Sequence, residues 1–275
     1  MQHILPLRFT YDFGAPVWRI RLDTAARRLA LEVRDADLLL AHFYTLQTET
    51  LALQQLPVPS GKAWWQGLED AQHGHVYLHG YGDRKLGQHK GITALEAATL
   101  AVAWDEPGLA FYGMAEEGVL AYTADAPEAA FQELQAATGA CLRTDLTQQE
   151  AAEAVARYSA ARFRQAVYPV LYLEGEDYFT QVQQFLESRQ LHGAALAIEY
   201  AETGEAIIIS SYWRTPGGSY QNCIVVFDHT GSLCLKAVLA DGLTGIGSDT
   251  FFIFMDDLYF LKDKAHLEVY RLLAC

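Results

Sequence analysis

Three histidines stand close together at His73, His75 and His79. Their odd numbering would place all three side chains on one face of a β-strand, and imidazole nitrogens are common ligands of zinc and other transition metals. His75 and His79, however, are four residues apart, about 13 Å along a strand, which is too far for both to hold one ion. We therefore predict no metal here and expect these histidines to be solvated or hydrogen-bonded within the sheet, with His89 lying further along the chain.

A second group of candidate residues is aromatic. Trp64 and Trp65 are adjacent, and Tyr212, Trp213 and Arg214 precede a short loop that contains proline and glycine. Exposed Trp, Tyr and Arg side chains are frequent anchors of ligand and protein contacts. The alternative is that the same side chains pack between sheets. We treat all five as candidate ligand-binding residues.

Two further candidates are Lys90, which could project into a central channel, and Asp249, which could bind a cation or a ligand hydroxyl. Asp249 ends the segment Gly245-Ile-Gly-Ser-Asp249, which lacks the Lys-Ser/Thr of a phosphate-binding P-loop and precedes a predicted strand, not the helix of a dinucleotide site. The alternative is a tight entry turn. The sequence also lacks the Gly-x-Ser-x-Gly motif of a nucleophilic serine. Catalytic residues are therefore not identified.

A recurring sequence pattern, called the phrase below, indicates the strands and turns that must position these residues. An apolar strand, a polar turn and a second strand are found at Phe43–Leu53, at Ile92–Val102 and, more loosely, at Ile224–Leu235. A half-copy follows at Leu267–Leu272. The copies are spaced in multiples of a period near the roughly 40–50 residues of a propeller blade. Many short strands joined by turn residues are typical of all-β folds.

These spacings predict a mainly β, propeller-like fold of about six blades, formed by residues 1–275 as a single domain. Residues 4–11 are candidates to pair with the C-terminal strands. The segment 127–190 departs from the repeat and is expected to be rich in helix, with helices over Pro127–Ala137, from Thr147 to about Val167, and over Tyr178–Arg189. The alternative architecture is an α+β open sheet with these helices on one face.

Charge, apolar runs and cysteine spacing limit the partners and the location that we expect. The chain has 275 residues and a formal net charge of −14, and the absence of a basic stripe argues against a nucleic-acid partner. Without a signal peptide or a long apolar run, we expect no membrane partner and a cytoplasmic location. Four irregularly spaced cysteines are expected to be free thiols. Cys223 and Cys234 are not expected to lie opposite each other in their hairpin.

Two resemblances accompany these patterns. The segment Lys90–Trp104 resembles a quinoprotein-type propeller repeat through Leu95, Thr99 and Trp104, while Glu96 and Leu100 replace its usual Asp and Gly. No quinone site is implied. The whole chain is similar to an uncharacterised bacterial domain-of-unknown-function family through three segments, which are Pro16–Ile20, Lys90–Ile92 and Gly245–Phe252. That resemblance implies a fold and no activity.

We therefore expect a propeller-like binding or interaction module for a protein or a small molecule, with no cofactor. The alternative is an enzyme, a hydrolase or lyase, with a channel-facing Asp, His or Lys. Such an enzyme would gather several titratable residues in a concave pocket.

Overall fold

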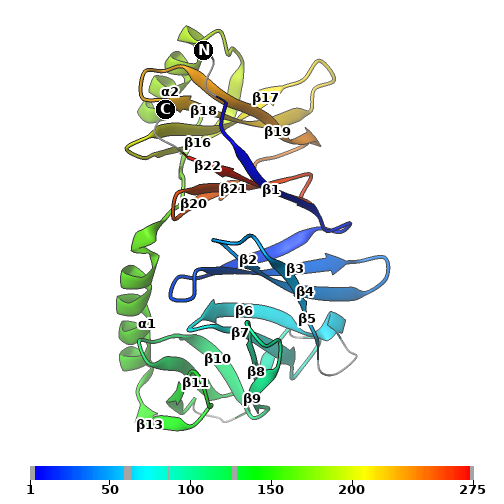
Figure 1. The fold of residues 1–275 in the computed structure, drawn as a ribbon, viewed down its shortest axis with the longest axis vertical. Coiled ribbons are helices and arrows are strands. Elements are labelled where there is room, and N and C mark those ends of the chain that lie inside the picture. The colour runs from blue at the N-terminus through cyan, green and yellow to red at the C-terminus, as the bar shows by residue number, and fades with distance from the viewer. Residues whose placement is uncertain (1–3, 59–62, 86, 126–128, 273–275) are drawn as a thin grey trace. The chain divides into compact units, whose positions relative to one another are not determined.

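The computed structural model describes residues 4–58, 63–85, 87–125 and 129–272, and the chain forms two compact units (Figure 1). The central unit is Ala15–Arg164, and the terminal unit combines Met1–Gly14 with Gln165–Cys275. Each unit has its own sheets and its own buried clusters.

Among its described residues, the central unit has three sheets, each made of four consecutive antiparallel strands. The first is β2 (Val17–Asp23), β3 (Arg28–Asp35), β4 (Leu40–Gln47) and β5 (Leu53–Leu56). The second is β6 (Gly67–Gln72), β7 (His75–Tyr81), β8 (His89–Glu96) and β9 (Val102–Glu106). The third is β10 (Leu109–Met114), β11 (Gly118–Thr123), β12 (Phe131–Gln135) and β13 (Cys141–Leu146). A short 3-10 helix, Ala63–Trp65, precedes β6.

Apolar side chains fill the spaces between neighbouring sheets of this unit. Phe43 and Leu56 of the first sheet pack with Leu78 of the second. Tyr77 and Trp104, on the other side of the second sheet, pack with the third. The second sheet is therefore covered on both faces, as a blade inside a propeller is.

The turn between the third and fourth strands repeats in all three sheets of this unit. The amides of Leu51, Leu100 and Gly139 donate to carbonyls four residues earlier, at 2.8, 2.9 and 2.9 Å, and all three residues have positive φ, at 58, 63 and 69°. Trp104 donates from its indole nitrogen to the Ala136 carbonyl at 2.7 Å. A Cβ on Gly139 would lie 2.8 Å from the Trp104 ring, so glycine is needed there.

This repeated turn corrects one expectation. The helix predicted over Pro127–Ala137 is wrong, because its described part forms strand β12 and the start of its turn, while Pro127 lies outside the described residues. The segment Leu134-Gln-Ala-Ala-Thr-Gly139 is a further copy of the phrase found at Leu95–Leu100. Its alanines suggested a helix, but strand pairing with β11 outweighs that weak preference.

Helix α1 (Gln148–Arg162) begins as predicted but ends before the expected Val167, because Ala166 and Val167 form a short strand. Thr147 and Glu150 form a reciprocal capping box, in which the Thr147 hydroxyl accepts from the Glu150 amide at 3.2 Å. At the other end the Arg162 guanidinium donates to both carboxylate oxygens of Asp70 on β6, at 2.8 and 2.7 Å. Both side chains are largely buried, so this pair fixes the end of α1 to the second sheet.

The described part of the terminal unit has two five-stranded antiparallel sheets. One runs β15 (Val170–Leu173), β16 (Ala194–Glu202), β17 (Ala206–Arg214), β18 (Tyr220–Asp228) and β19 (Leu233–Leu243). The other has the order β1 (Leu7–Asp12), β22 (His266–Arg271), β21 (Asp257–Lys262), β20 (Phe251–Phe254) and β14 (Ala166–Val167). Strand β1 pairs with β22, which confirms the predicted pairing of the N-terminal strand with the C-terminal strands.

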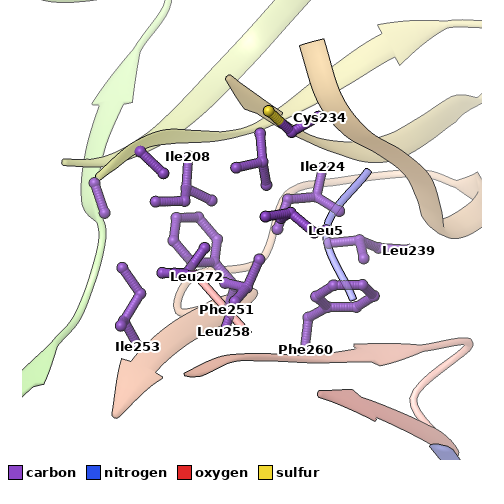
Figure 2. Close-up of a cluster of buried hydrophobic side chains, with 13 residues drawn as sticks. Leu5, Ile208, Ile224, Cys234, Leu239, Phe251, Ile253, Leu258, Phe260 and Leu272 are labelled. Atoms are coloured by element: carbon purple, nitrogen blue, oxygen red, sulfur yellow. The ribbon is translucent and has the colours of Figure 1, made fainter. Parts of the chain in front are cut away.

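A buried apolar cluster joins the two sheets of the terminal unit. Figure 2 shows Ile208 and Ile224 of one sheet facing Phe251, Leu258 and Phe260 of the other. Helix α2 (Asp177–Ser188) covers the opposite face of the β15–β19 sheet through Phe179 and Leu186. The apolar spacing in this helix was predicted, and its packing role is confirmed.

The prediction of a mainly β fold built from propeller-like sheets is confirmed. Five sheets occur in the described part of the chain, against about six expected. The helices α1 and α2 take up chain length that the repeat spacing had assigned to another sheet. That all 275 residues form one domain stays a prediction. Neither α1 nor α2, the two α-helices of the described residues, is long and apolar enough to cross a membrane.

The described cysteines bear on two predictions, that the thiols are free and that Cys223 does not face Cys234. Cys141 and Cys223 are free thiols, as predicted, while Cys275 lies outside the described residues. Cys223 pairs with Val238 across the β18–β19 hairpin. It is therefore not opposite Cys234, again as predicted.

Candidate functional site

A β-bulge interrupts the first strand of each sheet in the central unit. The ladder register shifts around Trp18 in β2, Glu69 in β6 and Tyr112 in β10, so each of these residues is the extra one. A bulge re-aims side chains and is frequent beside functional sites. All three bulged residues line cavities or clusters described below.

A buried ion pair positions the segment before β6. Arg34 donates to Glu32 at 2.5 Å and to the carbonyls of Trp64 and Gln66 at 3.0 and 2.7 Å. The second carboxylate oxygen of Glu32 accepts from the Leu68 amide at 2.8 Å. The charged groups are therefore paired and hydrogen-bonded, as burial requires, and they fix the two tryptophans at the edge of the sheet.

These elements enclose a cavity of about 280 Å³, which we call the Trp/Arg pocket. Its lining residues are Trp18, Arg19, Glu32, Arg34, Trp64, Trp65, His79, Tyr81 and Arg84. The Arg34 guanidinium lies 5.3 Å from the Trp18 ring centre and 5.1 Å from that of Trp64. Arg84 lies 4.6 Å from the ring centre of Trp65. The volume lies just below the range for small-molecule sites, about 300–1,000 Å³.

The Trp/Arg pocket combines exposed aromatic surface with positive charge. Trp18 is 63% exposed and Trp65 is 37% exposed. Three arginines and one glutamate line the cavity, although the whole chain carries a net charge of −14. A concave positive site in an acidic protein focuses the local field toward anions.

Next to this pocket, Glu69, His79 and His89 bring one carboxylate and two imidazoles together from β6, β7 and β8. The Nδ1 atoms of His79 and His89 lie 2.9 and 2.7 Å from the same Glu69 oxygen. All three ligand atoms lie within 4.8 Å of one another. The imidazole rings are stacked, with centres 3.5 Å apart and planes 11° apart. This is the chemistry of a two-histidine, one-carboxylate metal site.

The local environment favours an ionised carboxylate beside a neutral imidazole. Burial lowers the pKa of His79, and the charges of His89 and Arg19 add to this effect while Glu69 opposes it. Burial raises the pKa of Glu69, but its close contacts and charge interactions with the His79 and His89 imidazoles outweigh burial, so the net shift is downward. Both shifts favour the protonation states that bind metal.

His79 is held by close packing. Its side chain is buried, and neither ring nitrogen makes a hydrogen bond of acceptable geometry, although Nδ1 is close to Glu69. A Cβ added at Gly67 would lie 2.5 Å from Cε1 of His79 and 2.7 Å from its Nε2. The absence of a side chain at Gly67 thus makes the space that the imidazole occupies.

Glu69 and His89 also line a second, polar cavity of about 530 Å³, bordered by the third sheet and α1. Arg21 and Asp70 contribute to its wall, as does the bulged residue Tyr112. Arg21 donates to the Glu69 backbone carbonyl at 2.8 Å, which holds the bulge. The cluster is therefore reached from this cavity, while His79 faces the Trp/Arg pocket.

The predicted histidine group separates in the structure. His79 joins the cluster with His89, but His73 stacks on Tyr158 of α1 with ring centres 5.8 Å apart. His75 is hydrogen-bonded through Nδ1 to the His73 carbonyl at 2.9 Å. His75 is thus hydrogen-bonded close to its own strand, whereas His73 lies in the turn between β6 and β7 and contacts α1, so the three histidines do not share one strand face as predicted.

The aromatic and basic candidates fall in both units. Trp64 and Trp65 line the Trp/Arg pocket, whereas Tyr212, Trp213 and Arg214 belong to β17 of the terminal unit. The Trp213 indole donates to Ser211 at 2.7 Å, and Lys236 lies 4.4 Å from its ring centre. These partners are local to their sheet.

Lys90 forms an ion pair with Asp125 and lies on β8, next to His89. Arg214 is exposed and donates to the Tyr220 hydroxyl at 3.2 Å. Neither side chain lines the Trp/Arg pocket.

Asp249 belongs to a segment that is anchored to its own unit. Its amide and that of Thr250 donate to the buried carboxylate of Glu199, at 2.5 and 3.1 Å. Tyr212 is buried and its hydroxyl accepts from the Gly247 amide at 2.7 Å. These contacts fit the tight entry turn to β20 that was the alternative for this segment.

Sequence reasoning missed Glu69, Trp18 and Arg19. Glu69 is ten residues from His79 and twenty from His89, so only strand pairing brings them together. The available signal was Gly67, since a glycine in a strand often marks a bulge or a close approach.

Comparisons with known proteins find one matching domain model and add no function. Residues 22–104 match the model described as a domain of unknown function, DUF4905. The match covers Glu69, His79 and His89. Among curated proteins none matches the chain.

Two similar solved structures are propellers by title, and a third, Sqt1, is also similar to this chain. The β-propeller domain of the Trilobed protease from Pyrococcus furiosus is 10% identical, with a TM-score of 0.33, over 89% of this chain and 64% of that one. The Dos1 propeller is 10% identical, with a TM-score of 0.35, over 98% and 66%. Sqt1 of Saccharomyces cerevisiae is 9% identical, with a TM-score of 0.32, over 98% and 99%. This chain thus spans just under two thirds of the first two, and at these scores the likeness says nothing of function.

Proposed function

We propose that the central unit is a small-molecule binding module whose ligand is an anion with a flat or apolar portion, held in the Trp/Arg pocket. One observation carries this proposal, which is the gathering of three arginines and two exposed tryptophan rings around one cavity of an acidic chain. Guanidinium groups recognise carboxylate and phosphate well. Indole rings offer a stacking surface for a flat group.

A small molecule fits these features better than a protein partner does. The side chains converge on a concavity and do not form a broad, flat patch, and the rigid Arg34–Glu32 pair fixes the cavity wall. A largely preformed, concave site with a few placed polar groups is typical of small ligands.

The test is a titration monitored by tryptophan fluorescence. Benzoate, indole-3-acetate and AMP serve as anionic probes, and benzamide, indole-3-acetamide and adenosine as their neutral counterparts. We expect at least one anion to bind and its neutral counterpart to bind at least about tenfold more weakly, since a hydrogen bond to a charged group contributes about 1.5–3 kcal/mol.

Substitutions in and away from the Trp/Arg pocket test whether the anion binds there. Arg84→Gln and Trp65→Leu should each weaken binding of the anion, whereas Trp213→Phe in the terminal unit should leave the affinity unchanged. Equal binding of anionic and neutral probes would sink the proposal. So would full affinity in both pocket variants.

A second candidate function is an enzyme, a hydrolase or lyase, and the Glu69, His79 and His89 cluster favours it because it places titratable groups beside a polar cavity. Hydrolysis of p-nitrophenyl acetate or p-nitrophenyl phosphate that Glu69→Gln abolishes would support this candidate. Turnover unchanged by that variant would exclude the cluster as its active site.

A further inference from the structure

We propose that Glu69, His79 and His89 form a binding site for one divalent transition-metal ion of the zinc or iron type, held by a carboxylate oxygen and two imidazole nitrogens. This inference does not depend on the proposed anion ligand. It rests on the three side chains, on the bulge that directs them and on the polar cavity beside them.

The spacing of the donor atoms fits one ion. Atoms that share an ion at about 2.0–2.2 Å lie roughly 3–3.5 Å apart. The two imidazole nitrogens lie 2.9 and 2.7 Å from the Glu69 oxygen, close to that range. The stacked rings must tilt apart to aim both nitrogens at the ion. His89 has room to do so, since its side chain is 34% exposed and borders the polar cavity.

The burial of His79 supplies a second, independent observation. Its ring nitrogens are buried without a well-formed hydrogen bond. A buried polar group without a partner destabilises the folded chain. Coordination would satisfy Nδ1, which faces Glu69. Glu69 itself is the extra residue of a β-bulge, so its side chain is directed by an irregularity that sheet formation does not need.

The surroundings select the kind of ion. Arg19 and Arg21 donate to the carbonyls of Leu68 and Glu69 at 2.8 Å each, so two positive charges lie near the cluster. Their repulsion disfavours cations that the three ligands would bind only weakly. Imidazole ligands suit zinc, iron, cobalt, nickel and copper, whereas magnesium and calcium prefer all-oxygen sites. We therefore expect tight Zn²⁺ binding and no measurable Mg²⁺ binding.

Three protein ligands leave positions for water or a substrate atom on the side of the polar cavity. Tyr81 links the cluster to the Trp/Arg pocket, because its ring makes edge contacts with Trp65, His79 and His89 at 5.9, 5.2 and 5.6 Å between centres. Zn²⁺ binding should therefore also change the fluorescence of Trp65.

The test uses the full chain, stripped with a chelator and titrated with ZnCl₂ by calorimetry. We expect one Zn²⁺ per chain, with proton release that appears as a dependence of the measured heat on the buffer. Glu69→Gln, His79→Ala and His89→Ala should each weaken binding by more than about 100-fold, beyond the 10–100-fold typical of lost outer-shell partners. His75→Gln, on the same strand and face, is the matched control and should bind as the wild type.

Circular dichroism identifies variants that fail to fold, and His89→Ala, the partly exposed position, then carries the test. No heat and no retained Zn²⁺ in the wild type would overturn the proposal, as would wild-type affinity in His89→Ala and Glu69→Gln. Because Glu69 does not line the Trp/Arg pocket, Glu69→Gln should lose the metal and keep the anion, and Arg84→Gln should do the reverse. The two proposals can therefore fail separately.

Discussion

Replacing Gly67 by alanine tests how the fold positions His79. The added Cβ would lie 2.5 Å from Cε1 of the imidazole, whereas unstrained carbon contacts lie at about 3.5–4.0 Å. The ring or the start of β6 must therefore shift by roughly 1 Å. Metal-ligand distances tolerate only about 0.2 Å.

We expect Gly67→Ala to lower the free energy of unfolding by about 1–3 kcal/mol, the usual cost of overpacking, and to weaken Zn²⁺ binding. Urea denaturation gives the first quantity and calorimetric titration the second. Gly108→Ala is the matched control in the same unit, because no atom lies within 4 Å of the Cβ it would add. Wild-type stability together with wild-type Zn²⁺ affinity in Gly67→Ala would refute the reasoning.

Three further predictions concern stability. Thr147→Ala removes the cap of α1 and should cost about 0.5–2 kcal/mol in urea denaturation, with Thr147→Ser near wild type. Arg162→Ala leaves Asp70 buried without its partner and should cost about 3–5 kcal/mol by the same measurement; a loss below 1 kcal/mol would mean that the pair does not hold α1. Because the pKa of folded His79 is lowered, the unfolded chain takes up a proton that the folded chain resists. Stability should therefore fall as the pH drops below about 6.5. Melting temperatures at successive pH values should show this slope in the wild type, and an equal slope in His79→Gln would contradict it.

Local patterns in the sequence were sufficient to predict many of the strands and turns and the start of α1. The strand and turn phrase at Phe43–Leu53 and Ile92–Val102 marked the outer hairpins of two sheets, and Thr147 with Glu150 marked the start of α1. These signals are short-range, since each depends on side-chain alternation or on one capping interaction.

The candidate site depended on pairing between strands, which one sequence does not reveal. Trp64 and Trp65 were recognised by residue type, but Glu69 reaches the histidines only through a bulge that shifts its register against β7. The same kind of error affected residues 129–137, where alanines next to Thr138 and Gly139 suggested a helix. Pairing with β11 decided the outcome.

The most direct test of the central claim, that the Trp/Arg pocket is the ligand site, is a crystal structure of the chain soaked with the anionic probe that binds best in solution. We predict the anionic group within hydrogen-bonding distance of Arg19 or Arg84 and the flat group against Trp18 or Trp65. Probe density at another site, with this pocket empty, would contradict the claim.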